Sequence, residues 1–269
     1  MISIKTLLAY TKHYSKNSFL GSAISFHKFQ EKNKKKYQKE YSDLKNLGYH
    51  IIEDYISKTS ARDLDEKFKH SLTKYSSHIN EKDDQRLFGV EHCLNGANPL
   101  YNDEKLSIIS LLVNKERTYC GFTLGGYLKS GQNGSSGGGW HRDAFLSQFK
   151  AMLYLTDVCP ENGPFQLLPK SHKLRNVMSA IHKGGLKHWQ DRLSDEEVEK
   201  VEGVLGIKRK TFVGKAGTLI LFNSTCIHRG KPIETGERSA LTNYYFPISR
   251  NIAALRKQFK PMLNSSDCI

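Results

Sequence analysis

The sequence predicts a mainly β protein with flanking helices, and two observations support this. From about Tyr119 onward, short apolar runs of strand length follow one another, separated by turn residues such as Pro160-Glu-Asn-Gly. Many short, evenly spaced strands are typical of a β-sandwich or barrel. Before that point, residues 1 to about 46 are polar and have a helical pattern. We therefore expect N-terminal helices followed by a β core.

The expected strands of the second half are apolar runs of four to ten residues. They are residues 119–128, 150–155, 165–168, 219–222 and 240–246. An earlier strand is expected at Gly48-Tyr-His-Ile-Ile-Glu-Asp-Tyr-Ile, followed by a helix that Ser60 could cap. Another helix is expected over Leu106 to Leu112.

A charged helical segment, residues 172–210, interrupts the strands. An insertion of this kind either covers a site or packs on the outside of the sheet, and the sequence leaves both open. A length of 269 residues allows one or two domains. We expect residues 1–46 to form a basic helical extension and residues 47–269 to form one domain that contains the insertion.

The net charge of +14 lies partly in one run, Lys28-Phe-Gln-Glu-Lys-Asn-Lys-Lys-Lys-Tyr-Gln-Lys-Glu. Such a run could contact nucleic acid or an acidic membrane surface. A solvated helical surface is the simpler interpretation, because no nucleic-acid-binding module surrounds the run. The overall charge favours an anionic substrate or partner.

The five cysteines are scattered, and no two of them form a C-x-x-C pair. This pattern argues against a disulfide scaffold and against a thiolate zinc site. No apolar stretch has the length of a membrane span, and Met1 to Tyr14 lacks the continuous apolar region of a secretion signal. We therefore expect a cytoplasmic protein. The sequence does not indicate an oligomeric state.

The chemistry begins at Trp140-His141-Arg142-Asp143. In a β-strand, residues i and i+2 point to the same face, so His141 and Asp143 would project together and Arg142 would point away. An imidazole and a carboxylate suit a divalent first-row metal. An H-x-D pair alone is a weak signal, because it also occurs by chance.

A second element strengthens this hypothesis. Residues 217–228 form an apolar run followed by a short turn and His228, and Arg238 opens the next strand ten residues later. Two histidines and one carboxylate are the ligand set of non-haem Fe(II) oxygenases. A 2-oxo acid that chelates such a metal needs a cationic fork for its far carboxylate, which Arg provides better than Lys. The predicted metal ligands are therefore His141, Asp143 and His228, with Arg238 for the cosubstrate.

The ordered set of H-x-D, Glu161-Asn-Gly, Pro169-Lys-Ser-His172 and the late His and Arg resembles the phytanoyl-CoA dioxygenase family, over roughly residues 47–248. The resemblance implies a double-stranded β-helix, which is a jelly-roll core. It also implies an Fe(II)- and 2-oxoglutarate-dependent dioxygenase that uses O2, oxidises a small molecule, and releases succinate and CO2. The open alternative is a jelly-roll protein that binds metal or ligand without turnover.

Some positions depart from the family pattern or extend it. Ala240 stands where many such oxygenases have a hydroxyl residue that contacts the far carboxylate, so Thr242 or Tyr244 is expected to replace it. The presence of Asp143 favours hydroxylation over halogenation, because related halogenases have a small residue there. His172 is expected to be a structural hydrogen-bonding residue. The pocket is expected to include Tyr127, Phe145, Gln166 and Tyr244.

Overall fold

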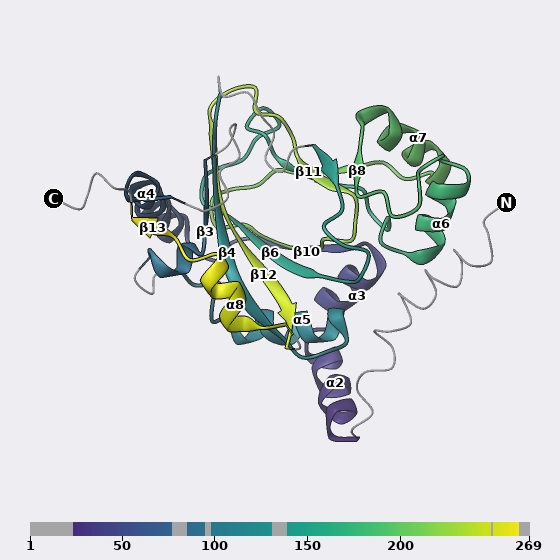
Figure 1. Ribbon diagram of the computed structural model, residues 1–269, viewed down its shortest axis with the longest axis horizontal. Helices are drawn as coiled ribbons and strands as arrows, with labels where there is room; N and C mark the ends of the chain where they lie inside the picture. The colour runs from purple at the N-terminus through teal and green to yellow at the C-terminus, as the bar shows by residue number, and fades with distance from the viewer. Residues whose placement is uncertain (1–23, 77–84, 95–97, 131–138, 249, 264–269) are drawn as a thin grey trace.

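The computed structural model describes residues 24–76, 85–94, 98–130, 139–248 and 250–263. Two antiparallel sheets pack against each other, and most helices lie around the larger sheet (Figure 1). The rings of Phe165 and Phe222, one from each sheet, lie with centroids 4.7 Å apart. The fold is the predicted jelly roll, mainly β with flanking helices.

The six-stranded sheet, called here the major sheet, has the order β1-β10-β6-β12-β4-β3. Its strands are β1 (Tyr49–Ile52), β10 (Leu219–Asn223), β6 (Phe149–Tyr154), β12 (Glu237–Pro247), β4 (Thr118–Lys129) and β3 (Gln85–Phe88). The five-stranded minor sheet has the order β8-β5-β11-β7-β9. Its strands are β8 (Arg192–Leu193), β5 (Trp140–His141), β11 (His228–Gly230), β7 (Phe165–Leu167) and β9 (Lys210–Phe212).

The helices lie around these two sheets. They are α2 (Ile24–Lys36), α3 (Gln38–Asn46), α4 (Lys58–Lys74), the 3-10 turn η1 (Val90–His92), α5 (Glu104–Asn114), α6 (Leu174–His182), α7 (Asp195–Leu205) and α8 (Ile252–Gln258). A small sheet pairs β2 (Tyr75–Ser76) with β13 (Met262–Leu263). Among the described residues, no helix combines the length and apolar character needed to cross a membrane.

The expected strands and the helix at Leu106 to Leu112 are all found, with ends shifted by up to four residues. The predicted cap Ser60 is wrong. The helix begins earlier, and Ser57 caps it by accepting a hydrogen bond from the Ser60 amide. The prediction failed because both serines precede the apolar positions, and only the backbone geometry distinguishes them. Residues 1–23 of the predicted N-terminal extension lie outside the described residues.

Strand alternation divides the core into two parts. On β6, Phe149, Ala151 and Leu153 point to the face of the major sheet that is covered by α4 and α5, where they join one apolar cluster. Tyr154 points to the other face and packs between the sheets with Phe165, Phe212 and others. Each fully buried side chain of this size contributes about 1.5–3 kcal/mol. The period-2 pattern therefore fixes which side chains of each strand can reach the space between the sheets.

The insertion at 172–210 does both of the things that the sequence left open. Its helices α6 and α7 bury Val198 and other apolar side chains against Trp140 and Ile227 of the minor-sheet region. Its short strand β8 pairs with β5, so that Arg192 lies opposite His141. The insertion therefore both packs outside the sheet and supplies a residue next to a predicted metal ligand.

Candidate metal centre

The fold brings the three predicted ligands together. His141 and His228 lie opposite each other on the neighbouring strands β5 and β11, and Asp143 follows β5. Their ligand atoms all lie within 4.8 Å of one another. The Nε2 atoms of His141 and His228 are 3.6 and 3.5 Å from the Asp143 carboxylate. Two imidazole nitrogens and one carboxylate oxygen converging in this way fit a first-row divalent cation such as Fe(II).

Backbone carbonyls orient both imidazoles. Nδ1 of His141 is 2.8 Å from the carbonyl of Gly139, and Nδ1 of His228 is 2.8 Å from that of Cys226. A carbonyl only accepts, so each Nδ1 carries the proton and donates it. Each Nε2 therefore keeps its lone pair and faces Asp143. Hydrogen bonds of this kind fix the tautomer and the ring orientation of metal-binding histidines.

Burial also favours the protonation states that a metal needs. It lowers the pKa of His228 to about 3, assisted by the nearby His141, and it lowers the pKa of His141. Burial alone would raise the pKa of Asp143, but the Lys150 ammonium and the two histidines hold it well below its usual range. The site therefore presents neutral imidazoles beside an ionised carboxylate at neutral pH.

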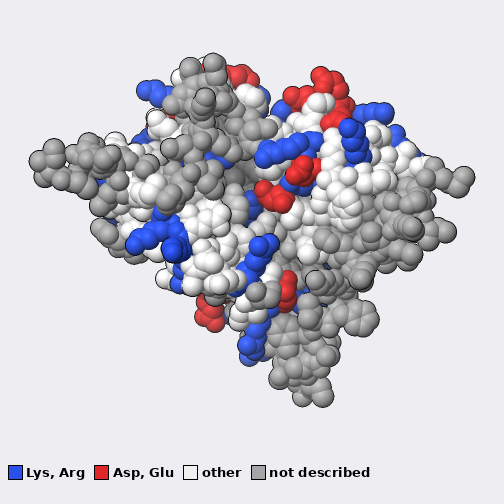
Figure 2. Space-filling model, in the orientation of Figure 1, with Lys and Arg blue, Asp and Glu red and all other residues white. Residues whose placement is uncertain are grey.

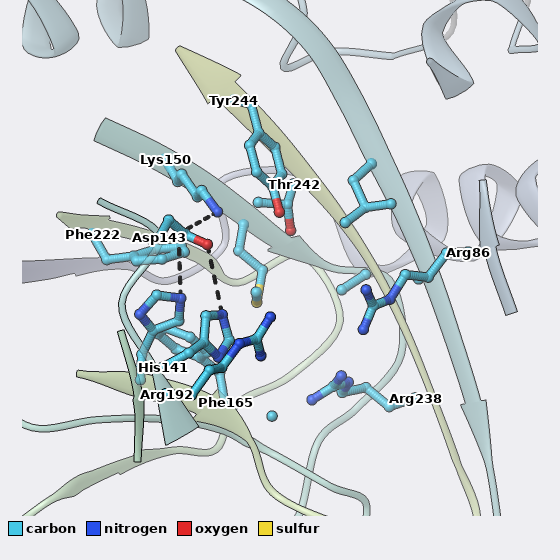
Figure 3. Close-up of a pocket in the computed structure, with 16 residues that line it drawn as sticks. Arg86, His141, Asp143, Lys150, Phe165, Arg192, Phe222, Arg238, Thr242 and Tyr244 are labelled. Carbon is cyan, nitrogen blue, oxygen red and sulfur yellow. Dashed lines mark ion pairs between the residues drawn. The ribbon is translucent and has the colours of Figure 1, made fainter. Parts of the chain in front are cut away.

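Lys150 is a member of the site that the sequence interpretation missed. Its Nζ is 2.6 Å from Oδ2 of Asp143 and 3.7 Å from the centre of the Tyr244 ring. Burial would lower the pKa of Lys150, but Asp143 holds it above its ordinary value. A buried ammonium in an ion pair at this distance fixes the position of the carboxylate (Figure 3). The alternation of side chains on β6 could have indicated this role. Phe149 and Ala151 point to one face of the sheet, so Lys150 must point to the other, where the pocket lies.

Arg142 points away from the ligands, as predicted, and links the chain around them. It is buried, and its guanidinium donates to the carbonyls of Ser171 (2.9 Å) and Thr225 (2.5 Å). The Ser171 hydroxyl in turn accepts a hydrogen bond from the amide of Ile227. These contacts join the predicted family segment, the chain before His228 and the chain after His141.

His172 has the structural role that the sequence predicted. Its Nε2 lies 3.2 Å from the carbonyl of Lys45, and its Nδ1 lies 3.1 Å from the Cys226 thiol. Burial lowers its pKa to about 4, so the ring is neutral. It ties α3 to the turn before His228.

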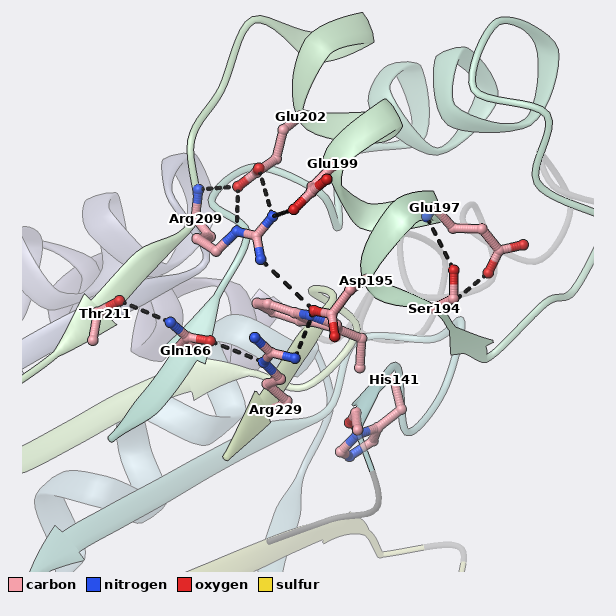
Figure 4. A network of polar contacts seen from close by, with 12 residues as sticks. His141, Gln166, Ser194, Asp195, Glu197, Glu199, Glu202, Arg209, Thr211 and Arg229 are labelled. Atoms are coloured by element: carbon pink, nitrogen blue, oxygen red, sulfur yellow. Dashed lines mark hydrogen bonds and ion pairs between the residues drawn. The ribbon is translucent and has the colours of Figure 1, made fainter. Parts of the chain in front are cut away.

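The outer face of the minor sheet is bound to the insertion through Asp195, the first residue of α7. Its Oδ1 accepts hydrogen bonds from Nε1 of Trp140 (2.8 Å) and from Arg229 (2.7 Å). These two residues directly neighbour His141 and His228 in the sequence. The Arg229 guanidinium lies 4.4 Å from the Trp140 ring and also donates to Gln166 (Figure 4). We call Trp140, Asp195 and Arg229 the outer clamp.

A pocket of about 160 Å³ opens beside the three ligands, between the sheets. Arg238 lines it from the start of β12 and is buried, and its guanidinium donates to the carbonyl of Gly163. Gly163 ends the Glu161-Asn-Gly turn and has a φ of +69°, which favours glycine. The turn that the sequence singled out thus holds the predicted cosubstrate residue in place.

Thr242 and Tyr244 line the same pocket, on the same face of β12 as Arg238 and Ala240. In Figure 3 they lie on the side of Lys150, whereas Arg86 and Arg192 lie on the side of Arg238. The sequence interpretation missed both of these arginines. Arg86 belongs to a four-residue edge strand that carries little apolar pattern, and Arg192 to a two-residue strand.

Of the four expected pocket residues, Tyr244 lines the pocket and three others are absent from its lining. Tyr127 bonds to Glu237, and Gln166 bonds to Thr211 and Arg229 on the outer face of the minor sheet. Phe145 lines a separate apolar hollow with His172 and Leu112. Their residue types were suitable, but the strand alternation and the loop path turn them away.

Comparison with known proteins gives matches for both the sequence and the fold. Residues 128–240 match the family model described as phytanoyl-CoA dioxygenase (PhyH). A stretch of 112 residues is 27% identical to L-proline trans-4-hydroxylase from Streptomyces griseoviridis; it covers 37% of this chain and 41% of that protein. The chain thus spans less than half of the length of this curated relative.

Solved structures with a similar fold include the non-haem α-ketoglutarate-dependent carbocyclase SnoK from nogalamycin biosynthesis. The two share a TM-score of 0.59 and 14% identity, over 78% of this chain and 83% of that one. EctD from S. alaskensis, with 2-oxoglutarate and 5-hydroxyectoine, gives a TM-score of 0.60 and 16% identity, over 78% and 75%. These likenesses support the jelly-roll fold.

The matched stretch 128–240 includes His141, Asp143, His228 and Arg238. The resemblance predicted from the motifs is therefore confirmed, since the family model of phytanoyl-CoA dioxygenase matches the stretch that holds all four of these residues.

Proposed function

We propose that this protein is an Fe(II)- and 2-oxoglutarate-dependent dioxygenase that hydroxylates a small molecule and releases succinate and CO2. His141, Asp143 and His228 would hold the iron. The observation that carries the proposal is the convergence of their ligand atoms within 4.8 Å, in a pocket that Arg238 also lines. When bound, iron with 2-oxoglutarate supplies the activation of O2 that oxidation of a C–H bond requires.

The chain's own residues have four tasks in this proposal. The carbonyls of Gly139 and Cys226 hold the imidazoles in the ligand tautomer. Lys150 keeps Asp143 ionised and positioned. Arg238 pairs with the distal carboxylate of 2-oxoglutarate, which places the cosubstrate in one orientation. Thr242 and Tyr244 remain the predicted helpers of Arg238.

The walls of the pocket include Phe165 and Phe222, whose rings lie 5.6 and 5.5 Å from the His228 ring. Apolar side chains beside the metal ligands would favour exclusion of water once substrate is bound, which strengthens electrostatic contacts and protects reactive species from side reactions. The relative that acts on L-proline makes free amino acids the first substrates to assay.

The test is anaerobic addition of Fe(II) and 2-oxoglutarate to the purified protein. A metal-to-ligand charge-transfer absorption band is expected in the wild type. It should be lost in His141→Ala, which removes a ligand, and weakened in Arg238→Ala, which removes the partner of the distal carboxylate. A wild-type protein without the band contradicts the proposal. Formation of the band without succinate release from any substrate would support the non-catalytic alternative.

We further propose that the protein acts in the cytoplasm on a small-molecule substrate, as one domain over residues 47–269 with residues 1–46 as its helical extension. The described cysteines Cys93, Cys120, Cys159 and Cys226 are unpaired thiols, which suits a reducing compartment. Among the described residues on the face shown in Figure 2, basic and acidic side chains are interspersed. Cell fractionation with an antibody against the chain tests the location.

A further inference from the structure

Three guanidinium groups meet in the pocket. Arg86 comes from β3 at one edge of the major sheet, Arg192 from β8 at one edge of the minor sheet, and Arg238 from β12. In Figure 3 all three point toward a common space on the side away from Lys150. Arg238 is buried, Arg86 is half-buried and Arg192 is exposed, so the three extend from the interior toward solvent.

The described lining of the pocket is rich in basic side chains. Four of its side chains are basic, and Asp143 is the acidic one. Asp143 pairs with Lys150 at 2.6 Å. Guanidinium groups that line one space favour a ligand that carries a carboxylate, because each presents N–H donors in a planar fork.

The backbone leaves room for such a ligand beside Arg86. On the neighbouring strand, Gly126 lies opposite Arg86, and Ala240 lies opposite Gly126 on the strand after that. A Cβ atom built on Gly126 would meet nothing within 4 Å. Between Arg86 and β12, these paired positions therefore carry no side chain larger than the methyl group of Ala240. The space beside them belongs to the same pocket as the metal ligands.

We propose that Arg86 and Arg192 form a second carboxylate-binding site, and that the substrate is a small carboxylic acid such as an amino acid or a hydroxy acid. This inference rests on the proposed function, since it gives Arg238 to the cosubstrate. Arginine matches a planar carboxylate with two parallel N–H donors. Anchoring the substrate by its carboxylate over Gly126 and Ala240 holds its carbon chain toward the metal ligands.

The first experiment tests whether Arg86 and Arg192 bind the carboxylate of 2-oxoglutarate or that of the substrate. Arg86→Gln, Arg192→Gln and Arg238→Gln are titrated anaerobically with 2-oxoglutarate in the presence of Fe(II), and the charge-transfer band is followed. Arg175→Gln, an exposed site on α6, is the matched control for the change of net charge. The affinity for 2-oxoglutarate should change by less than about threefold in Arg86→Gln and Arg192→Gln, and fall by at least about tenfold in Arg238→Gln.

If Arg86→Gln and Arg192→Gln lower the affinity for 2-oxoglutarate as strongly as Arg238→Gln does, then Arg86 and Arg192 bind the cosubstrate and the proposal is overturned. If the wild type gives no band, the proposed function itself fails, and this inference falls with it. The two failures are therefore distinguishable.

The second experiment uses turnover. Wild-type enzyme with Fe(II), 2-oxoglutarate and O2 is given the common L-amino acids, small hydroxy acids and the methyl ester of each, and succinate release is measured. At least one free acid should stimulate release, and its ester at least about tenfold less. Arg86→Gln and Arg192→Gln should lose at least about tenfold of the stimulation, and Arg175→Gln should keep it.

Gly126→Val provides a variant that changes no charge. Its side chain fills the space beside Arg86, so it should abolish the stimulation while the charge-transfer titration with 2-oxoglutarate stays within about threefold of the wild type. The proposal is overturned if no free acid stimulates the wild type at millimolar concentration, or if an ester works as well as its acid.

Discussion

The major and minor sheets differ most in strand length. On the major sheet, β4 has 12 residues and β12 has 11, and the two pair along their whole length. On the minor sheet, β5 has two residues and β11 has three, and they pair at His141 and His228. Arg238, proposed for the cosubstrate, lies on the long strand β12, whereas the two histidines lie on the short strands β5 and β11.

The two sheets therefore hold their residues by different means. Long strands hold Arg238 and Lys150 through many backbone hydrogen bonds. Short strands provide few such bonds, and contacts with the surrounding chain position the ligands instead. On the inside, carbonyls of the preceding residues orient the imidazoles. On the outside, the outer clamp of Trp140, Asp195 and Arg229 binds both histidine strands to α7.

The largest expected effect comes from removing the aromatic part of the clamp. Trp140 is 1% exposed, and Trp140→Ala should cost about 3–5 kcal/mol of unfolding free energy and also weaken Fe(II) binding. Phe68→Ala is the matched control, because Phe68 is equally buried but packs against Gly125 of the major sheet. It should cost a similar free energy and leave Fe(II) affinity unchanged. Chemical denaturation measures the unfolding free energy, and metal titration measures the affinity for Fe(II). Equal metal affinities in both variants would show that Trp140 does not position the metal ligands.

A comparison of pH titrations between variants tests the major sheet. Glu91 accepts a hydrogen bond from the Thr123 amide of β4, and burial raises its pKa from 4.5 to about 7. The native Glu91 carboxyl therefore keeps its proton between these values, where the unfolded one has lost it, so the contribution of Glu91 to stability should fall as pH rises from about 4.5 to about 7. This contribution changes by an amount on the order of 3 kcal/mol.

Glu91→Gln keeps an acceptor for the amide and removes the titration of this group, so the unfolding free energy of the wild type should fall relative to that of the variant as pH rises over this range. Glu66→Gln, at an exposed position of α4, is the control. Urea denaturation at several pH values measures the difference. A Glu91→Gln protein with the same pH dependence as the wild type would show that the buried carboxyl is not its source.

The smallest expected effect comes from the polar part of the clamp. The Asp195 side chain is 57% exposed, so Asp195→Ala should change stability little. It should weaken Fe(II) binding by about tenfold, because the outer faces of both histidine strands lose their common acceptor. Asp195→Asn keeps an oxygen acceptor and should restore most of the affinity, whereas Glu196→Ala on the same helical turn should have no effect. An Asp195→Ala protein with wild-type affinity would mean that the short strands hold the ligands unaided.

Much of the site could be predicted from sequence because its signals are local. His141 and Asp143 are two residues apart on an extended segment, and Arg238 follows His228 at a spacing that fits adjacent strands. Lys150, Arg86 and Arg192 were missed because each stands in a short or mixed run whose orientation depends on its partners. Phe145 and Gln166 were placed wrongly for the same reason, since a suitable residue type does not show which way its side chain points.

Alternation and motif spacing act over a few residues, so they were enough to predict the strand-rich character, the jelly-roll resemblance and the set of three ligands. The side chains that surround those ligands depend on how the sheets pack. Arg86 and Arg192 lie far apart in the sequence, on edge strands of different sheets, and nothing in their local patterns relates one to the other. They line one pocket with Arg238 only because the packing of the two sheets brings β3 and β8 to the same opening.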